Sequence, residues 1–413
     1  MSAARHIAVV GAGMAAARFA ERHHALGGTA RITLHGAEPR PPYNRVLLAD
    51  VLTGRYAAEA VALPVGAAEL RVGSEAVAVD LAARTLTSAD GRTETWDELV
   101  LATGANPVLP PIRGLRRPDG SGLRDGVHSL RTLADCARLG EDLGRARRAV
   151  VIGGGVLGVS VARALGALGL TVEIVHQGPH LIERQLDAEA AAALREGLRR
   201  MGVEVYPNNR ARAVVGRHGT GDSAVELANG YRLGTDLVVL ACGVRPRTAL
   251  AHAAGLTVDT GIVVDDTLAA SAPHVHAIGD CTQHRGVVHG LSGPAWEQAD
   301  VLAARLSGAD PDALYQGSRP LARLSAGPLE YAAFGEAHLD AEDQAADPDL
   351  NVLRLSDATR GSYKKLVLRG ERLVGAILLG DLATVGDLAG AYERDASLPD
   401  RPLHLLTSYG ASP

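Results

Sequence analysis

Two stretches of the chain share one pattern of hydrophobic and polar positions. Each begins with a short run of apolar, mostly β-branched residues, passes through a cluster of glycines and continues into an alanine-rich helical pattern. The first stretch starts at His6 and the second at Arg148, and apolar runs at residues 32–35 and 172–176 follow them. A strand, a glycine turn, a helix and a second strand in this order predict a βαβ unit with parallel strands. We therefore predict an α/β fold built on two such units.

The spacing of the glycines in each unit is typical of a turn that binds a dinucleotide. Glycine at the first position permits the tight turn, glycine at the second lets a pyrophosphate approach the backbone, and a small residue at the third lets the helix pack close to the strand. These positions are Gly11, Gly13 and Ala16 in the first unit and Gly153, Gly155 and Gly158 in the second. Phosphate bound there lies at the positive end of the helix dipole. Because the pattern occurs twice with matching flanks, it predicts two Rossmann-like dinucleotide-binding domains.

The residues after each second strand bear on which dinucleotide is bound. An acidic residue at this place holds the ribose hydroxyls of the nucleotide. Glu38 is the candidate in the first unit, whereas His176 and Gln177 in the second unit bring neither an acid nor an arginine. This rule therefore leaves the choice between NADH and NADPH open.

Two further segments complete an order of motifs found in flavoproteins. Residues 96–104 resemble the strand and A-T-G turn that closes an FAD domain against an NAD(P)H domain, and residues 272–280 resemble the late G-D motif whose aspartate binds the ribityl chain of FAD. The chain thus resembles the flavoprotein reductases with two dinucleotide domains, which implies FAD in the first unit and NAD(P)H in the second. The resemblance places Glu38, Arg45, Val77, Thr103, Gly104, Gly279 and Asp280 in the FAD site, and Ser160 and His176 in the NAD(P)H site.

Finer matches narrow the family. Residues 42–48, 183–187, 281–291 and 363–381 resemble the flavin module of assimilatory nitrite reductase large subunits. Arg45 stands where related ferredoxin and rubredoxin reductases often carry a lysine, and Ser160 stands where these enzymes and the nitrite reductases carry a glutamate. The resemblance implies an electron-transfer subunit of assimilatory nitrate or nitrite reductase.

The connecting segments of the chain predict three domains, the second of which is inserted in the first. A stretch rich in proline and glycine at 107–126 marks the crossover into the second domain, and residues 244–246 mark the return. We expect an FAD-binding domain at 1–112 and 246–322, an NAD(P)H-binding domain at 113–245, and a small α+β domain at 323–413. Strand-like runs at 362–369 and 372–379 and a helical pattern near 384–392 support the last of these.

Composition excludes several classes of function. The net charge of −5 lacks the basic excess of a nucleic-acid-binding protein. The three cysteines, Cys136, Cys242 and Cys281, form no C-x-x-C pair, which favours a reducing cytoplasm over a secreted disulfide framework. Apolar runs are too short to span a membrane. We expect a cytoplasmic protein.

The cysteines and histidines also limit the chemistry. Three cysteines are too few for the four thiolates of an ordinary iron–sulfur cluster, and none lies near Tyr43, where disulfide reductases of this fold place a redox-active one. Cys281, His284 and His289, with His274 and His276 nearby, do not have a standard zinc spacing, so we predict a polar wall near the flavin and no metal. No side chain is assigned as catalytic, because the flavin does the chemistry.

These observations predict an NAD(P)H-dependent, FAD-containing oxidoreductase that passes electrons from NADH to a separate acceptor protein. We expect the acceptor to be a nitrate or nitrite reductase subunit, with a rubredoxin or ferredoxin as the alternative. A non-catalytic flavin-binding redox sensor and an oxidase or disulfide reductase are the competing hypotheses.

Overall fold

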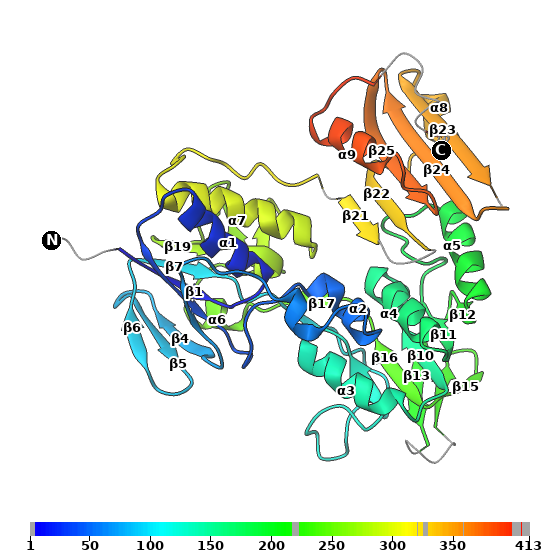
Figure 1. Cartoon of the computed structure of the whole chain (residues 1–413), viewed down its shortest axis with the longest axis horizontal. Helices are drawn as coiled ribbons and strands as arrows, with labels where there is room; N and C mark the ends of the chain where they lie inside the picture. The colour runs from blue at the N-terminus through cyan, green and yellow to red at the C-terminus, as the bar shows by residue number, and fades with distance from the viewer. Residues whose placement is uncertain are drawn as a thin grey trace. The chain divides into compact units, whose positions relative to one another are not determined.

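The computed structural model of the chain describes residues 5–216, 223–319, 321–324, 329–357, 359–398 and 406. The chain divides into two compact units, whose elements are labelled in Figure 1. The first unit comprises Met1–Leu48, Tyr56–Pro107 and Val244–Pro320, and the second comprises Ala49–Arg55, Val108–Gly243 and Leu321–Pro413. The second unit thus contains the predicted NAD(P)H-binding and C-terminal regions together.

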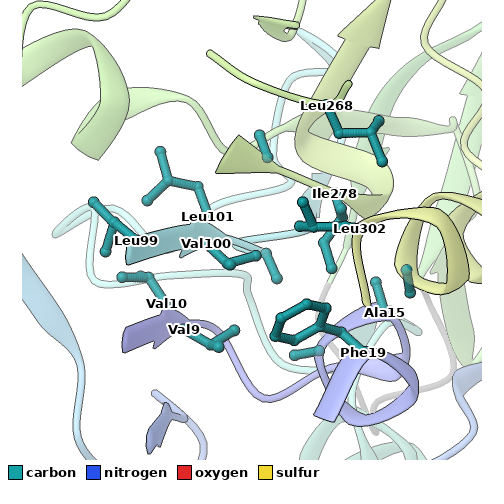
Figure 2. Close-up of a cluster of buried hydrophobic side chains, with 14 of the residues drawn as sticks. Val9, Val10, Ala15, Phe19, Leu99, Val100, Leu101, Leu268, Ile278 and Leu302 are labelled. Atoms are coloured by element: carbon teal, nitrogen blue, oxygen red, sulfur yellow. The ribbon is translucent and has the colours of Figure 1, made fainter. Parts of the chain in front are cut away.

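A five-stranded parallel sheet organises the first unit. Its strand order is β19 (Val275–Ala277), β7 (Glu98–Leu101), β1 (His6–Val10), β2 (Arg31–His35) and β3 (Glu69–Arg71). Strands β1 and β7 are buried along their whole length, which is why they read as continuous apolar runs. Helices α1 (Met14–Ala25) and α7 (Ser292–Ser307) pack against each other, and Phe19 of α1 points into the same core cluster as Val100 and Leu302 (Figure 2).

Smaller elements complete the first unit. The antiparallel sheet of β4 (Ala76–Asp80), β5 (Thr85–Ser88) and β6 (Thr93–Thr95) lies between β3 and β7 in the chain. Others are β18 (Ile262–Val264), β20 (Thr282–His284), α6 (Ala249–Ala253), and the short 3₁₀ turns η1 (Arg45–Leu47), η2 (Ala58–Val61) and η3 (Gly279–Cys281). Strands β8 (Ala105–Pro107) and β17 (Val244–Pro246) form an antiparallel ribbon, and the chain leaves for the second unit and returns from it at this ribbon.

The second unit begins with α2 (Leu48–Leu52), most of which belongs to it, and contains another parallel sheet of five strands. The strand order is β12 (Val203–Tyr206), β11 (Thr171–Val175), β10 (Arg148–Ile152), β16 (Leu237–Leu240) and β9 (Val127–Ser129). Helices α3 (Leu133–Leu143), α4 (Val156–Ala167) and α5 (Ala188–Arg200) accompany it, with a three-stranded antiparallel sheet of β13 (Ala211–Val215), β14 (Ala224–Leu227) and β15 (Arg232–Gly234). The two βαβ units predicted from the sequence are therefore β1–α1–β2 and β10–α4–β11, which confirms the α/β prediction.

The C-terminal part of the second unit is an antiparallel sheet with two helices. Its strand order is β21 (Leu321–Leu324), β22 (Tyr331–Gly335), β25 (Arg372–Leu379), β24 (Ser362–Arg369) and β23 (Leu350–Asp357). Helix α8 (Ala341–Ala346) precedes β23, and α9 (Val385–Glu393) packs on β22 and β25. The two strand-like runs of the sequence are β24 and β25, and the predicted last helix is α9.

Both lysines of the chain are buried side by side in β24. Lys365 lies 3.0 Å from the carboxylate of Asp187, which also accepts a hydrogen bond of 2.8 Å from the hydroxyl of Tyr363. Lys364 lies 2.8 Å from Asp381. Asp187 is the N-cap of α5, where its other oxygen accepts from the amide of Ala190 at 2.9 Å. Burial opposes ionisation of Asp187, but these bonds and the Lys365 charge outweigh it and lower its pKa.

Asp187→Asn tests what this buried pair contributes. Asparagine keeps the size and the helix cap but removes the negative charge, so the ammonium of Lys365 stays buried without a counter-ion. We expect the free energy of unfolding to fall by about 3–5 kcal/mol in equilibrium urea unfolding. Glu189→Gln is the matched control, because Glu189 begins the same helix and pairs with Arg354 of β23 at an exposed place. It should cost less than about 1 kcal/mol, and equal losses in the two variants would contradict the prediction.

Candidate functional site

Three sequence motifs meet at one edge of the first parallel sheet. Val10, Leu101 and Ala277 are paired across β1, β7 and β19. Each motif starts directly after its paired residue, at Gly11, Ala102 and Ile278 respectively. Because the carboxyl ends of neighbouring parallel strands lie at the same edge, the glycine turn, the A-T-G turn and the G-D motif come together, and this edge is where open α/β sheets bind ligands.

The first glycine turn is shaped by a close backbone approach. Gly11 has φ +112°, and a Cβ built on it would lie 2.2 Å from the carbonyl oxygen of Ala102. Gly13 is the N-cap of α1 and offers no side chain to the helix amides, and the space where its Cβ would stand is open. Ala16 is fully buried under the turn. An open cradle with uncapped helix amides fits the pyrophosphate of a dinucleotide.

Glu38 and Arg45, both predicted in the FAD site, are brought into contact. Arg45 donates to one carboxylate oxygen of Glu38, and the hydroxyl of Tyr43 donates to the other at 2.7 Å. The guanidinium of Arg45 also lies over the Tyr43 ring, 4.8 Å from its centroid. A carboxylate oxygen has two lone pairs, so Glu38 keeps acceptor capacity for a ribose hydroxyl. Arg45 fixes the orientation of this carboxylate.

The other predicted FAD residues lie around the same edge or in the neighbouring small sheet. The Thr103 hydroxyl donates to the carbonyl of Arg247 at 2.6 Å, and the carbonyl of Gly104 accepts from the Arg247 amide at 2.9 Å. Gly279 packs on α1, since a Cβ there would lie 3.0 Å from the Cβ of Ala15, and half-buried Asp280 follows it in η3. Val77 lies at a bulge in the pairing of β4 with β5, and its side chain is 52% exposed.

The second glycine turn repeats this geometry in the second unit. Gly153 has φ +115°, and its Cβ would lie 2.2 Å from the carbonyl oxygen of Ala241, the residue after β16. Gly155 is the N-cap of α4 without a side-chain cap, and the space beside it is open. A Cβ on Gly158 would lie 1.9 Å from the carbonyl oxygen of Gly153, so only glycine fits there. This cradle also fits a dinucleotide.

Ser160 and His176 take different places in the second unit. Ser160 is half-buried on α4, one turn beyond the glycine turn. His176 follows β11 directly, and its Nδ1 accepts a hydrogen bond of 3.1 Å from the amide of Gly154. Burial lowers the pKa of His176. His176 is therefore tied to the glycine turn itself.

Sequence reasoning missed two side chains near these turns. Gln298 of α7 is buried, and its side-chain oxygen accepts from the amide of Gly279 at 2.8 Å, which holds the G-D turn in place. Glu183 lies with one carboxylate oxygen 3.9 Å from Nε2 of His176. No local motif indicates Gln298. Glu183 begins the segment 183–187 that resembles the nitrite reductases, but that resemblance assigns it no role. Gly178 leaves room for it, because a Cβ there would lie 2.0 Å from that carboxylate oxygen.

Three of the histidines weighed as metal ligands bond to carboxylates. His274 and His276 lie 2.8 and 2.9 Å from the two oxygens of Glu98, and His284 lies 2.8 Å from Asp266. Burial raises the pKa of Glu98, but the bonds to His276 and His274 and the charge of Arg5 outweigh it and lower the pKa to about 2. Among the residues that the structure describes, no group of three or more His, Cys, Asp or Glu side chains has the arrangement of a metal site.

The three cysteines are largely buried, and none of them forms a disulfide in the described structure. Burial raises the pKa of each thiol: Cys281 bonds to the carbonyls of Leu101 and Ile278, Cys136 is buried on α3, and Cys242 is half-buried with its sulfur on the carbonyl of Ile152. A thiol with a raised pKa is a poor nucleophile.

The chain matches two family models. The model of pyridine nucleotide-disulphide oxidoreductases matches residues 5–300, and the model of the rubredoxin NAD⁺ reductase C-terminal domain matches residues 340–396. The first match contains both glycine turns, and the second contains β23, β24 and β25. In the described part of the chain, no helix is both long and apolar enough to cross a membrane.

Similar proteins include two from Bacillus subtilis. The chain is 33% identical to nitrite reductase [NAD(P)H] over 96% of its own length and 48% of that protein, and 32% identical to the assimilatory nitrate reductase electron transfer subunit over 85% of its length and 44% of that protein. The chain therefore spans about half the length of these relatives. The fold is also similar to the structure of a ferredoxin reductase from Rhodopseudomonas palustris. The match covers 95% of this chain and 95% of that chain, with a TM-score of 0.81 and 27% sequence identity.

Substituting alanine for Gly153 or for Gly155 distinguishes the effect of the second glycine turn on stability from its effect on nucleotide binding. Gly153→Ala puts a Cβ against the Ala241 carbonyl at a positive φ, so we expect the free energy of unfolding to fall by about 1–3 kcal/mol. Gly155→Ala meets no protein atom, so stability should change by less than about 0.5 kcal/mol, while the methyl group narrows the cradle and weakens binding of NAD(P)H. Urea unfolding and calorimetric titration measure the two effects. A Gly155→Ala variant that binds the nucleotide as tightly as the wild type would exclude this cradle.

Proposed function

The chain belongs to the pyridine nucleotide-disulphide oxidoreductase family, and on that premise we propose that it takes electrons from NADH and delivers them to a separate redox protein. As a member of this family it is an NAD(P)H-dependent flavin oxidoreductase with FAD and NAD(P)H as cofactors, which confirms the predicted enzyme class and cofactors. The acceptor and the roles of single residues belong to the proposal.

The repeated glycine turn is the observation that carries the proposal. In the first unit Gly11 and Gly13 would receive the FAD pyrophosphate, Glu38 and Arg45 its ribose region, and Asp280 its ribityl chain. In the second unit the residues that would hold NADH are Gly153, Gly155, Gly158, Ser160 and His176. Bound FAD supplies the exchange between the two electrons of a hydride and the single electrons that metal centres accept. The chain itself binds and orients the two nucleotides.

The cysteines support an acceptor other than a disulfide. A dithiol mechanism needs two sulfurs close together and at least one reactive thiolate. Cys136 and Cys281 are buried, none of the three cysteines forms a disulfide in the described part of the chain, and burial raises each thiol pKa. These cysteines therefore do not support the disulfide chemistry in the family's name, and electrons would leave through the flavin to another protein.

We favour a nitrate or nitrite reductase component as that acceptor. The two Bacillus subtilis relatives are named for nitrite reduction and for electron transfer in nitrate reduction, and the three cysteines of this sequence are too few for a four-thiolate cluster. Reduction of a six-electron substrate such as nitrite therefore needs a metal centre outside these residues. A cytoplasmic location, where NADH is available, is part of this proposal.

A rubredoxin or ferredoxin is the second candidate acceptor. The C-terminal match to rubredoxin NAD⁺ reductases and the similarity to the Rhodopseudomonas palustris ferredoxin reductase favour it. Arg45, in place of the lysine frequent in such reductases, speaks against it.

The flavin assignment is tested by releasing the cofactor. The purified protein should be yellow, and heat denaturation should release FAD, because we propose that the FAD is held non-covalently. Arg45→Met removes the ion pair that orients Glu38 and should weaken FAD retention about tenfold, measured by fluorescence after dilution. Arg92→Met, at an exposed pair with Asp90, is the control and should not change retention. Release of FMN, or of no flavin, would contradict the assignment.

The acceptor is identified by mixing pure protein, NADH and each candidate. Alone, the protein should oxidise NADH with an artificial dye but reduce neither nitrate nor nitrite. Addition of a nitrate reductase subunit that contains molybdenum and iron–sulfur centres should start NADH-dependent nitrate reduction. Fast reduction of a rubredoxin or ferredoxin, with none of that subunit, would replace the nitrogen-assimilation proposal by the second candidate. Failure even with dye would favour the non-catalytic redox sensor.

A further inference from the structure

A carboxylate from a residue later in the sequence lies at the end of β11 in the second unit. The residue after the strand is His176, and the acid expected near this place is missing from residues 176–178. Glu183 lies seven positions after His176, yet its carboxylate stands 3.9 Å from Nε2 of His176. The same carboxylate fills the space where a side chain at Gly178 would stand. The fold thus brings an acidic side chain to the end of β11, the second strand of this βαβ unit.

The backbone holds Glu183 there from both sides. On one side, Ile182 has φ +53°, and its amide donates to the carbonyl of Gly154 at 2.8 Å. On the other side, Asp187 is fixed by Lys365 and Tyr363. The segment between them is one tight turn in which the amide of Leu186 donates to the carbonyl of Ile182 at 3.0 Å. A carboxylate on such a segment is placed before any nucleotide binds.

His176 orients the carboxylate of Glu183. Because Nδ1 accepts from the Gly154 amide, the neutral ring carries its hydrogen on Nε2. This nitrogen is buried, the carboxylate of Glu183 lies 3.9 Å from it, and both this carboxylate and the backbone of His180 favour the protonated ring. A short approach of the carboxylate would satisfy the Nε2 hydrogen, which favours the position beside the strand end. The Glu183 side chain is still 44% exposed, so the carboxylate can reach a ligand.

We propose that Glu183 accepts a hydrogen bond from the adenosine ribose of the nucleotide and selects NADH over NADPH, with His176 as its positioning residue. The inference rests on the proposed function, since it concerns the nucleotide held by the second glycine turn. A 2′-hydroxyl donates to a carboxylate, whereas the 2′-phosphate of NADPH is an anion and is repelled by it.

The basic residues of the same segment are His176 itself, His180 and Arg184. Burial keeps His176 neutral near pH 7, since it lowers the pKa. Nδ1 of His180 lies 3.2 Å from the Leu181 carbonyl, and Arg184 is exposed. The residue beside the strand end is the acid.

The test compares binding of NAD⁺ and NADP⁺ to the FAD-loaded protein by calorimetry, in the wild type and in Glu183→Gln. The wild type should bind NAD⁺ more tightly, and the ratio of the two affinities should fall about tenfold in the variant, because glutamine keeps the size but removes the charge. Glu183→Arg should reverse the preference. Glu204→Gln, an exposed acid on β12, is the matched control and should leave the ratio unchanged.

The outcomes separate this inference from the proposed function. If both nucleotides bind to the wild type but Glu183→Gln keeps the wild-type ratio, or if the wild type prefers NADP⁺, the role of Glu183 is overturned while the oxidoreductase stands. If neither nucleotide binds to the wild type, the proposed function fails as well. Thermal unfolding of each variant shows whether a lost preference comes from misfolding instead.

Discussion

The close approach of a glycine to the backbone of a neighbouring strand is the constraint on which both sites depend. A Cβ at Gly11 would lie 2.2 Å from the carbonyl oxygen of Ala102, after β7, and a Cβ at Gly153 would lie 2.2 Å from that of Ala241, after β16. The two glycines have nearly the same positive φ. Any side chain at these two positions would push the helix away from the sheet edge. The approach keeps the uncapped start of α1 or α4 at the carboxyl ends of the strands. The same steric solution thus recurs in two units, where we propose that it holds FAD and NADH.

The buried ion pair of Asp187 and Lys365 also constrains the segment before α5 in the second unit. The C-terminal sheet reaches the nucleotide-binding region through Asp187, which caps α5 and at the same time bonds to Tyr363 and Lys365 of β24. Because a buried charge without its partner is costly, the segment before α5 cannot move freely while the sheet is folded. The placement of residues 182–187 is therefore set by residues nearly 180 positions later in the chain. If Glu183 has the role proposed above, stability and nucleotide recognition share this contact.

The sequence predicts the parts of the structure that depend on local patterns. The βαβ units, β24, β25 and α9 follow from periodicity and glycine spacing, and the positions of Gly11 and Gly153 follow from turn geometry alone. Contacts between distant side chains do not. Nothing near Gly279 indicates that Gln298 of α7 satisfies its amide, and nothing at His176 indicates an acid seven residues later. No sequence motif predicts the contact of Arg45 with Glu38 either, because it depends on how the loop after β2 folds back. The predicted domain limits and the roles of the predicted site residues stay predictions.

The burial of both lysines has a consequence for how this protein meets others. Lys364 and Lys365 are enclosed in β24, so the described surface presents no ε-amino group, and its positive charge is carried by arginine and histidine. A redox partner that docks on a basic patch of this chain must be recognised through planar guanidinium groups, which bind carboxylates in pairs of hydrogen bonds. Reagents that join proteins through lysine amines find no lysine target on this surface, and lysine acylation has no exposed site to regulate it. Acidic and arginine side chains are alternative targets for chemical trapping of its complexes.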